Sequence, residues 1–350
     1  MPKPKRLSQT AIAKTLGVSR ATVSLILRGG EGASEVTKTK VLAAAKKLGY
    51  RPNALVQSIR SGKSRTIGVL AQPHDSYWRD VCYGIHDRLI ESEHLPCFLW
   101  NNDRLGVESA DYCLKQIHRL LDHWVDGVVL WPFFAELYDV HLKEFQTRNI
   151  PLVAIDHPLP HASADVVESD ESQMAGLIVD HLTKLKHRQV LVVSGPKDDA
   201  WADNRFRAMK ERFGKVAGTV VHELRALLGP EVEPVNAEAI GAFLRAHPTI
   251  TAVVAGTDLI ARSAYLAANA LGWAIPQRLS VASVADLDFA VLLSPPLTTV
   301  RQDGYAIGRR AAQYVLERSA GLLTGPPKRF RQPGIFMARK STGPAPDLSK

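Results

Sequence analysis

Residues 8–27 read SQTAIAKTLGVSRATVSLIL, and the spacing of their apolar residues predicts two short helices. Ser8 is a favoured N-cap for a first helix that ends at Gly17, and Ser19 is a favoured N-cap for a second helix over about 20–27. The side chains expected to face inward are Ile12, Ala13, Leu16, Val23 and either Ile26 or Leu27. Two helices joined by a three-residue turn that contains glycine form a helix-turn-helix motif.

A third helix and a linker follow the motif. Ser34 is placed to cap this helix and Gly49 to end it. The core-facing residues of the third helix are expected to be Val41, Ala44, Ala45 and Leu48. Pro52 disfavours helix at the residue before it, and Asn53 is placed to cap a short segment over about 54–60. The first sixty residues are therefore predicted to form an all-α head followed by a linker.

The positive charge of the chain is concentrated in this head. The net charge of the whole chain is +9, but residues 1–66 hold 14 Lys and Arg against only Glu31 and Glu35, a net +12. Residues 67–350 therefore carry −3. A solvated basic tail is the alternative, but a disordered tail lacks regular apolar spacing and helix stop signals. A small folded basic module indicates a polyanionic partner, most simply nucleic acid.

Length and composition are those of a globular protein with two or three domains. Of the 350 residues, 45% are hydrophobic and 23% charged, which excludes a disordered tail protein, a collagen-like fibre and a disulfide scaffold. Three widely spaced cysteines, Cys82, Cys97 and Cys113, form no CxxC pair and indicate a reducing compartment. The basic N-terminus is not followed by an apolar run, and no apolar stretch approaches the roughly 18 residues of a membrane span. We expect a soluble, cytoplasmic protein with no membrane partner.

Strand and helix patterns alternate after residue 66. Short apolar strands are predicted at 67–70, 128–130, 152–155, 190–193, 252–255 and 279–282, with amphipathic helices such as 81–91, 110–121 and 175–185 between them. Alternating strands and helices predict parallel sheets covered on both faces, with ligands at the carboxyl ends of the strands. The roughly 280 residues involved are too many for one such sheet, so we expect two lobes with a cleft between them.

The head and linker resemble those of the lac-repressor (LacI/GalR) family. The motifs that carry the resemblance are Ile12-Ala13, Gly17-Val18-Ser19, Thr22-Val23-Ser24, Tyr50-Arg51-Pro52-Asn53 and Ser64-Arg65-Thr66-Ile67-Gly68. They run without a gap through about the first seventy residues. In that family the second helix enters the major groove of DNA, and the linker folds into a hinge helix in the minor groove.

The resemblance implies DNA contacts for particular residues. Arg20, Ala21 and Leu25 fall where the family reads bases; Arg20 has donors for guanine, and the other two offer apolar surface. The positions that hold phosphates are Ser8, Ser24, Arg28, Ser34, Thr37 and Asn53. Ile59, with Val56, matches the hinge position that wedges between base pairs, where the family usually has Leu. Ser8, Ser19, Ser34 and Asn53 are also favoured as helix caps, which is the alternative reading for these residues.

The rest of the chain is similar, more loosely, to the effector-binding module that this family shares with periplasmic sugar-binding proteins. The motifs, in family order, are Val125-Asp126-Gly127-Val128, Ile150-Pro151-Leu152, Ile155-Asp156, Gly195-Pro196, Thr257-Asp258, Pro276-Gln277-Arg278-Leu279-Ser280-Val281 and Pro295-Pro296-Leu297-Thr298-Thr299-Val300. The fold expected is thus an all-α helix-turn-helix head plus an α/β two-lobed, periplasmic-binding-protein-like module with parallel sheets. The expected domains are a head over 1–52, a hinge over 53–66 and a module over 67–345, whose N-lobe spans about 67–160 and 301–330 and whose C-lobe spans about 161–300 and 331–345.

An effector site is expected between the lobes. By the resemblance, Arg205 holds a ligand hydroxyl or carboxylate, the alternative being a structural salt bridge. Aromatic and acidic residues at strand ends could stack on a sugar ring or accept hydroxyl hydrogens, although the aromatic residues could equally pack the lobes. The full set of expected effector residues is Asp75, Tyr77, Trp78, Trp131, Phe133, Asp156, Arg205, Thr257 and Asp286. Thr257 stands where the family often has Asn, and Ala285 where a ligand-binding Asp is frequent, with Asp286 beside it.

No catalytic, metal or cofactor signal accompanies these features. The sequence contains no GxGxxG, HExxH or GxSxG motif, and its twelve histidines are scattered singly without metal-ligand spacing. We therefore expect no enzyme and no cofactor, but a transcription regulator, usually a repressor, controlled by a small polar effector. Because one helix-turn-helix reads only a few base pairs, a homodimer on an inverted-repeat operator is expected. The alternative is a cytoplasmic small-molecule-binding protein or enzyme with an adventitious basic head.

Overall fold

The computed structural model describes residues 8–27, 30–50, 58, 62–71, 73–100, 110–132, 144–159, 164–197, 199–228 and 232–348. The chain divides into two compact units, Met1–Ser64 and Arg65–Lys350. Each unit has its own hydrophobic core, as expected for independently packed domains.

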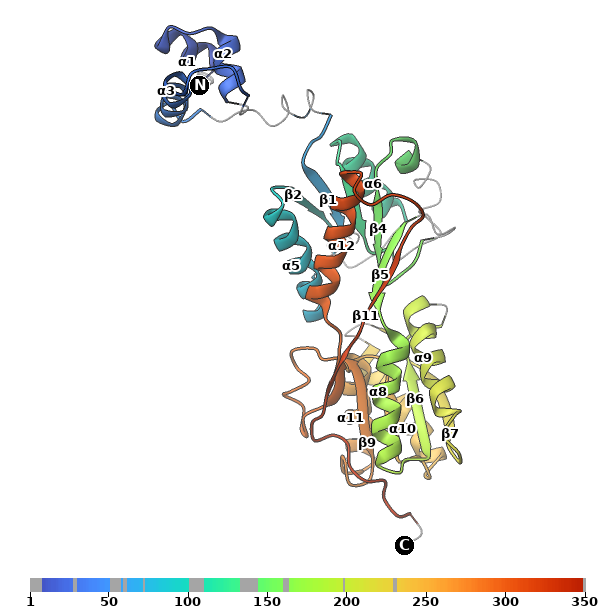
Figure 1. The fold of residues 1–350 in the computed structure, drawn as a ribbon. Coiled ribbons are helices and arrows are strands. Elements are labelled where there is room, and N and C mark those ends of the chain that lie inside the picture. The colour runs from blue at the N-terminus through green and yellow to red at the C-terminus, as the bar shows by residue number, and fades with distance from the viewer. Residues whose placement is uncertain are drawn as a thin grey trace. The chain divides into compact units, whose positions relative to one another are not determined.

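The described part of the first unit consists of the predicted helices α1 (Gln9–Leu16), α2 (Arg20–Ile26) and α3 (Glu35–Lys47) (Figure 1). The predicted caps are confirmed: the Oγ atoms of Ser8, Ser19 and Ser34 accept backbone N–H groups at 3.3, 3.0 and 3.3 Å. Gly17 ends α1 with φ +67°, a left-handed conformation that favours glycine. The core contains Ile12, Ala13, Val23, Ile26, Val41 and Ala45, with Leu16, Leu27, Ala44 and Leu48 partly buried against it.

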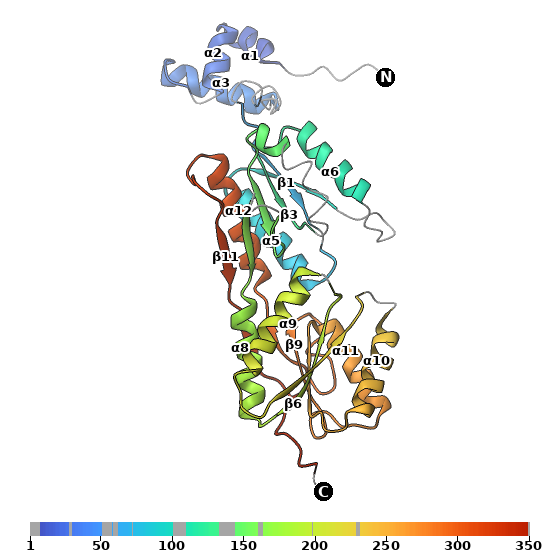
Figure 2. The same ribbon diagram turned by 90° about the vertical axis from the view of Figure 1, so that its right-hand side faces the viewer.

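The second unit contains two six-stranded sheets. The first, which we call the N-lobe sheet, has the order β11-β5-β4-β3-β1-β2 and is parallel throughout. Its strands are β1 (Thr66–Leu70), β2 (Leu95–Leu99), β3 (Gly127–Leu130), β4 (Leu152–Ile155), β5 (Asp165–Ser169) and β11 (Arg329–Gln332). Helices α5 (Ser76–Glu91) and α12 (Gly304–Ser319) pack on one face of this sheet, and α6 (Ala110–Asp122) packs on the other (Figure 2).

The second sheet, the C-lobe sheet, has the order β12-β10-β9-β8-β6-β7. Its strands are β6 (Gln189–Ser194), β7 (Val220–Arg225), β8 (Ala252–Ala255), β9 (Ser280–Ala285), β10 (Thr298–Arg301) and β12 (Ile335–Met337). Helices α8 (Glu171–Lys184) and α9 (Ala200–Phe213) cover one face, and α10 (Glu233–Ala246) and α11 (Asp258–Ala270) cover the other. The expectation of parallel sheets needs one correction, because β12 runs antiparallel to β10.

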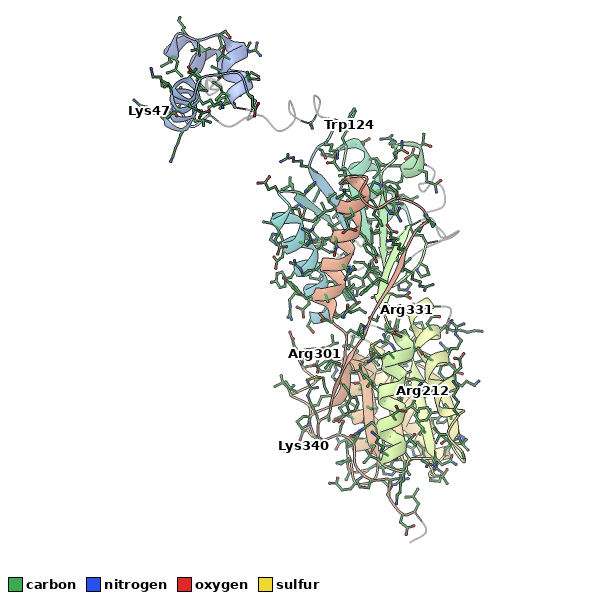
Figure 3. All side chains as sticks on the ribbon, viewed as in Figure 1. Lys47, Trp124, Arg212, Arg301, Arg331 and Lys340 are labelled. Carbon is green, nitrogen blue, oxygen red and sulfur yellow. The ribbon has the colours of Figure 1, made fainter. Side chains whose placement is uncertain are left out.

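The chain passes between the two sheets three times in the described residues. It crosses after Ser169, after Arg301 and after Gln332. The sequence placed the first crossing near residue 160, but β5 pairs with β4 in the N-lobe sheet and delays that crossing by about ten residues. Arg301 and Arg331 lie at the level of these crossings (Figure 3). The cleft between the lobes is therefore bordered by three connecting segments.

Helices α5 and α12 cross at two glycines. A Cβ at Gly84 would lie 2.2 Å from the carbonyl oxygen of Tyr305, and a Cβ at Gly308 would lie 2.1 Å from that of Val81. Both distances are far below van der Waals contact, so the two backbones approach closely only because neither position carries a side chain. This crossing holds the N-terminal end of α5, which contributes to the cleft, against the rest of the N-lobe.

None of the helices described here is both long and apolar enough to cross a membrane.

Candidate functional site

The predicted base-reading residues lie on α2. Arg20 and Ala21, at the start of the helix, are exposed, whereas Leu25 is half-buried. A Cβ at Gly30 would lie 2.4 Å from the Cδ1 atom of Leu25, so Leu25 packs against the chain that follows α2. Arg20 and Ala21 are thus available to a partner, and Leu25 also contributes to packing of the head.

The predicted phosphate contacts are partly occupied within the head. Ser8 and Ser34 use their hydroxyls as helix caps, the alternative that the sequence left open. The Oγ1 atom of Thr37 lies 2.9 Å from the Oγ atom of Ser34, and Ser24 is buried. The remaining predicted contacts lie outside the described residues: Arg28, Asn53, Val56 and Ile59.

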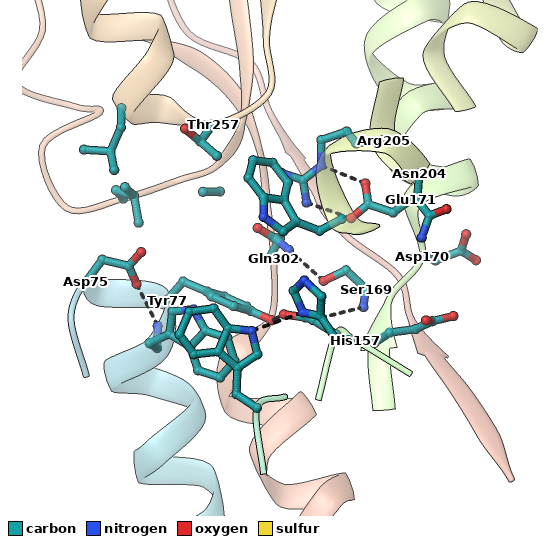
Figure 4. Close-up of a pocket in the computed structure, with 18 of the residues that line it drawn as sticks. Asp75, Tyr77, His157, Ser169, Asp170, Glu171, Asn204, Arg205, Thr257 and Gln302 are labelled. Carbon is teal, nitrogen blue, oxygen red and sulfur yellow. Dashed lines mark hydrogen bonds and ion pairs between the residues drawn. The ribbon is translucent and has the colours of Figure 1, made fainter. Parts of the chain in front are cut away.

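A cleft of about 1220 Å³ lies at the carboxyl ends of strands from both sheets, which is where parallel α/β sheets bind ligands (Figure 4). Seven of the predicted effector residues line it: Asp75, Tyr77, Trp78, Trp131, Asp156, Arg205 and Thr257. Phe133 lies outside the described residues. The topology therefore brings together side chains that are spread over more than half of the sequence.

The N-lobe wall of the cleft is aromatic. The ring centroids of Trp78, on α5, and Trp131, after β3, lie 4.5 Å apart. The His74 ring stacks on Trp131 at 5.4 Å, and Tyr77 meets Trp78 edge to face, also at 5.4 Å. Both tryptophans are largely buried, 5% and 8% exposed, and both line the cleft. Indole faces at a cleft wall suit the apolar faces of a sugar or another flat ring.

Tyr77 and Asp156 form a buried hydrogen-bonded pair beside this wall. The Tyr77 hydroxyl donates to Oδ2 of Asp156 at 2.7 Å, and Oδ1 of Asp156 accepts the backbone N–H of Ser169 at 3.3 Å. Burial raises the pKa of Asp156, and burial together with the Asp156 carboxylate raises the pKa of Tyr77 well above its usual value. Asp156 is therefore committed to internal hydrogen bonds on both carboxylate oxygens.

A chain of hydrogen bonds through His157 joins the two lobes. The Trp131 Nε1–H donates to Nδ1 of His157 at 3.1 Å, and Nε2 of His157 lies 3.2 Å from Oδ1 of Asp199, just before α9 in the C-lobe. An indole nitrogen can only donate, so Nδ1 of His157 accepts and Nε2 carries the hydrogen that is donated to Asp199. Gln302 makes a second link, at a chain crossing, where its Nε2 donates to the Ser169 hydroxyl at 2.7 Å.

Arg205 enters the cleft from α9 and is itself ion-paired. Its Nε and Nη2 atoms donate to the two carboxylate oxygens of Glu171, each at 2.7 Å, and Nη1 donates to the carbonyl oxygen of Gly256 at 2.6 Å. Its guanidinium carbon lies 5.0 Å from the centre of the Trp201 ring. Arg205 is 4% exposed. The salt bridge that the sequence left as an alternative is therefore present, within a residue that also lines the cleft (Figure 4).

Two other predicted residues act as helix caps. Oδ1 of Asp75 accepts the backbone N–H of Trp78 at 2.8 Å, and the Thr257 hydroxyl accepts that of Ile260 at 3.3 Å. Both residues line the cleft from the N-cap of a helix, and Oδ2 of Asp75 also lies 3.7 Å from Nε2 of His74.

The prediction for Asp286 needs correction, because Asp286 is not among the cleft-lining residues described here. Its carboxylate is buried and pairs with Arg301 at 2.7 Å and Arg339 at 2.5 Å. β9 ends at Ala285, and Ala285 and Asp286 both have positive φ, +133° and +62°, so the chain leaves the extended conformation here; Ala285 lines the cleft, and the Asp286 side chain lies against the two arginines. The Asp286 carboxylate therefore does not take the place of the ligand-binding Asp that is frequent in the family at the position of Ala285.

Several cleft residues were not predicted from the sequence. The C-lobe side includes Glu171, the first residue of α8, and Asn204, which precedes the predicted residue Arg205. Other polar or aromatic cleft residues that the sequence did not indicate include His157, Glu168, Trp201, Arg207, Glu211, Arg262, Gln302, Arg329 and Arg331.

Comparison with known proteins identifies relatives of both units. Residues 10–53 match the family described as bacterial regulatory proteins, lacI family, and residues 179–342 match the periplasmic binding protein-like domain. The chain is 28% identical over 310 residues to a ribose operon repressor of Halalkalibacterium halodurans, covering 88% of each chain. It is 24% identical over 310 residues to the HTH-type transcriptional repressor PurR of Photobacterium profundum, covering 88% of this chain and 90% of the relative.

The solved structures confirm the expected fold. A lac repressor dimer bound to operator and the anti-inducer ONPF superposes with a TM-score of 0.81 at 21% identity, covering 97% of this chain and 100% of the other. The helix-turn-helix head joined to a two-lobed α/β module is thus shared along nearly the whole chain.

Proposed function

Because the chain belongs to the lacI family of bacterial regulatory proteins, we propose that it is a sequence-specific DNA-binding transcription regulator, and specifically a repressor. The observation that carries this proposal is the position of Arg20 and Ala21, exposed at the start of α2 on a head with a net charge of +12 over residues 1–66. A helix with exposed donors on a basic helix-turn-helix unit fits the major groove of DNA.

The two-lobed cleft supplies the site of control. Its aromatic wall and its position at the strand ends fit a small, polar, sugar-like effector. His157 and Gln302 link the lobes at its border, so an effector that changes these contacts changes the relative orientation of the lobes. Relatives named as repressors of the ribose operon and as PurR support regulation rather than catalysis.

The acting species is proposed to be a homodimer on an inverted-repeat operator in the cytoplasm. One recognition helix reads only a few base pairs, and two heads related by two-fold symmetry double the number of base pairs that are read. The lac repressor that shares this fold was crystallised as a dimer on its operator.

Selection from a random double-stranded DNA library tests the proposal. The full chain is expected to enrich an inverted repeat, and fluorescence anisotropy is expected to give nanomolar to sub-nanomolar affinity for it, with salt-dependent, weaker binding to a scrambled site. The Arg20→Ala variant, which lacks the proposed base-reading side chain, is the matched control. Enrichment of no sequence, or equal affinity for the selected and scrambled sites, would refute sequence-specific regulation.

A further inference from the structure

Arg205, the most buried cation of the cleft, is neutralised before any ligand arrives. Its bidentate pair with Glu171 has the planar, two-bond geometry that a guanidinium would otherwise offer to a phosphate or carboxylate ligand. Glu171 therefore occupies, with its own carboxylate, the place that an anionic group of an effector would take.

Three of the other four arginines in the described cleft wall are also ion-paired. Arg262 pairs with Glu233 at 2.5 Å, and Arg329 and Arg331 both pair with Glu168, at 2.7 and 2.9 Å. Glu168 and Arg331 are directly opposite each other in the β5–β11 register, so the strand pairing itself fixes this contact.

Acidic groups outnumber basic ones around the cleft. The described lining residues include seven carboxylates and five arginines. The fifth arginine, Arg207, is exposed and donates to the side-chain oxygen of Asn204. The balance of formal charge at the cleft wall is thus negative, which disfavours an anionic ligand.

Hydrogen-bond donors for a neutral ligand remain. A guanidinium has five N–H groups, and three of those of Arg205 donate to Glu171 and Gly256, which leaves one N–H on each terminal nitrogen among the described contacts. With these donors beside the Trp201 ring, and with Trp78 and Trp131 on the opposite lobe, the cleft offers aromatic faces and polar edges together. That combination suits an uncharged polyhydroxylated ring.

From these contacts we infer that the effector is a neutral saccharide, and that Glu171 excludes phosphorylated and carboxylated analogues by holding Arg205. The inference rests on the proposed function and names the ligand class of its cleft. Glu171 is a specificity-determining residue in this scheme: it sets the charge that the site accepts, while the aromatic wall sets the shape.

Inorganic phosphate tests the role of Glu171 without knowledge of the effector. In the Glu171→Gln variant, the glutamine oxygen still accepts a hydrogen bond from Arg205, but the negative charge is gone. Titrated calorimetrically at constant ionic strength, phosphate is expected to bind this variant at least about tenfold more tightly than wild type, because a charge contact in a shielded site is worth at least that factor. The control is Glu211→Gln, which removes an exposed carboxylate from the same wall without releasing Arg205, and should leave phosphate affinity unchanged.

Phosphate affinity that is equal in wild type and Glu171→Gln, or equal gains in both variants, would overturn the assignment to Glu171. Wild-type protein gives an independent test that does not depend on a variant folding. Its thermal stability and operator affinity are measured with matched pairs of compounds, glucose against glucose 6-phosphate and ribose against ribose 5-phosphate, with cellobiose as a larger neutral sugar. At least one neutral sugar is expected to change the thermal stability and the operator affinity, whereas its phosphate ester is expected to change neither.

The two proposals fail in different ways. A phosphorylated sugar that shifts operator affinity, or a panel in which no neutral sugar acts, overturns the neutral-saccharide inference and leaves the regulator in place. Absence of sequence-specific DNA binding overturns the proposed function itself.

Discussion

Replacing Gly84 by alanine should destabilise the N-lobe by separating α5 from α12. The added Cβ would lie 2.2 Å from the Tyr305 carbonyl oxygen and 2.9 Å from the Arg309 nitrogen, both of them backbone atoms. Ordinary contact begins at 3.4 Å, so the helices must move apart by more than 1 Å. No side chain can rotate to make room, which places the cost near the upper end of overpacking, about 3 kcal/mol.

The intrinsic preference of helices for alanine over glycine offsets about 1 kcal/mol of this overpacking cost. The free energy of unfolding is therefore expected to fall by about 2 kcal/mol. Gly241→Ala is the matched control, because its Cβ in α10 would meet only the Cβ of Ala267 at 3.8 Å. That substitution should be neutral or stabilise by up to about 1 kcal/mol. Urea unfolding of the full chain, followed by tryptophan fluorescence, measures both. Equal midpoints for the two variants would refute the conclusion that the close crossing of α5 and α12 requires glycine.

Three further outcomes are expected. Arg20→Ala should lose about 1–3 kcal/mol of discrimination between the selected operator and a scrambled site in anisotropy titrations; equal losses on both sites would contradict base reading. Ser19→Ala should lower the free energy of unfolding of the head by about 1 kcal/mol in circular dichroism melts, whereas Ser19→Asn, which keeps a capping oxygen, should not. Burial raises the pKa of Asp258 from 3.8 to about 6, so the folded state holds this proton more tightly than the unfolded state. Wild type should therefore gain up to about 3 kcal/mol relative to Asp258→Asn as the pH falls from 7 to 4, and parallel pH profiles of the two proteins would contradict this.

The head could be predicted almost residue by residue because its signals are local. A serine before a helix, a glycine after it and apolar residues at helical spacing all act within a few positions, and the structure has the caps at Ser8, Ser19 and Ser34 as expected. The six apolar strands of the module were predicted for the same reason, since each is buried on both faces and reads as a continuous apolar run.

Edge strands were missed because they lack such runs. The outermost strand β11 reads RFRQ, and its arginines pair with Glu168 of the neighbouring strand rather than entering the core. The strand β2, LPCFL, contains a proline and lies at the opposite edge of the same sheet. These segments are strands because they pair with β5 and β1, not because their amino-acid composition favours a strand.

The cleft was predicted in its location but only partly in its chemistry. Strand ends indicate where a ligand binds, so Tyr77, Trp131 and Asp156 were found. The pairing of these side chains was not predicted, because Tyr77 lies 79 residues from Asp156 and Arg205 lies 34 residues from Glu171. Which charges remain available to a ligand depends on these long-range pairs, and sequence spacing does not contain them.

The three chain crossings determine the order in which the lobes are completed during synthesis. Helices α8–α11 and the strands β6–β10 come from the continuous segment 171–301, and only β12 is added later. The N-lobe begins first, but α12, which shares one face of its sheet with α5, and the edge strand β11 are both made after residue 303. The ribosome thus releases a nearly finished C-lobe while strands β3, β4 and β5 still lack helix α12, which packs on them. A chain that terminates after residue 301 would carry a C-lobe without β12 beside an N-lobe without α12 and β11.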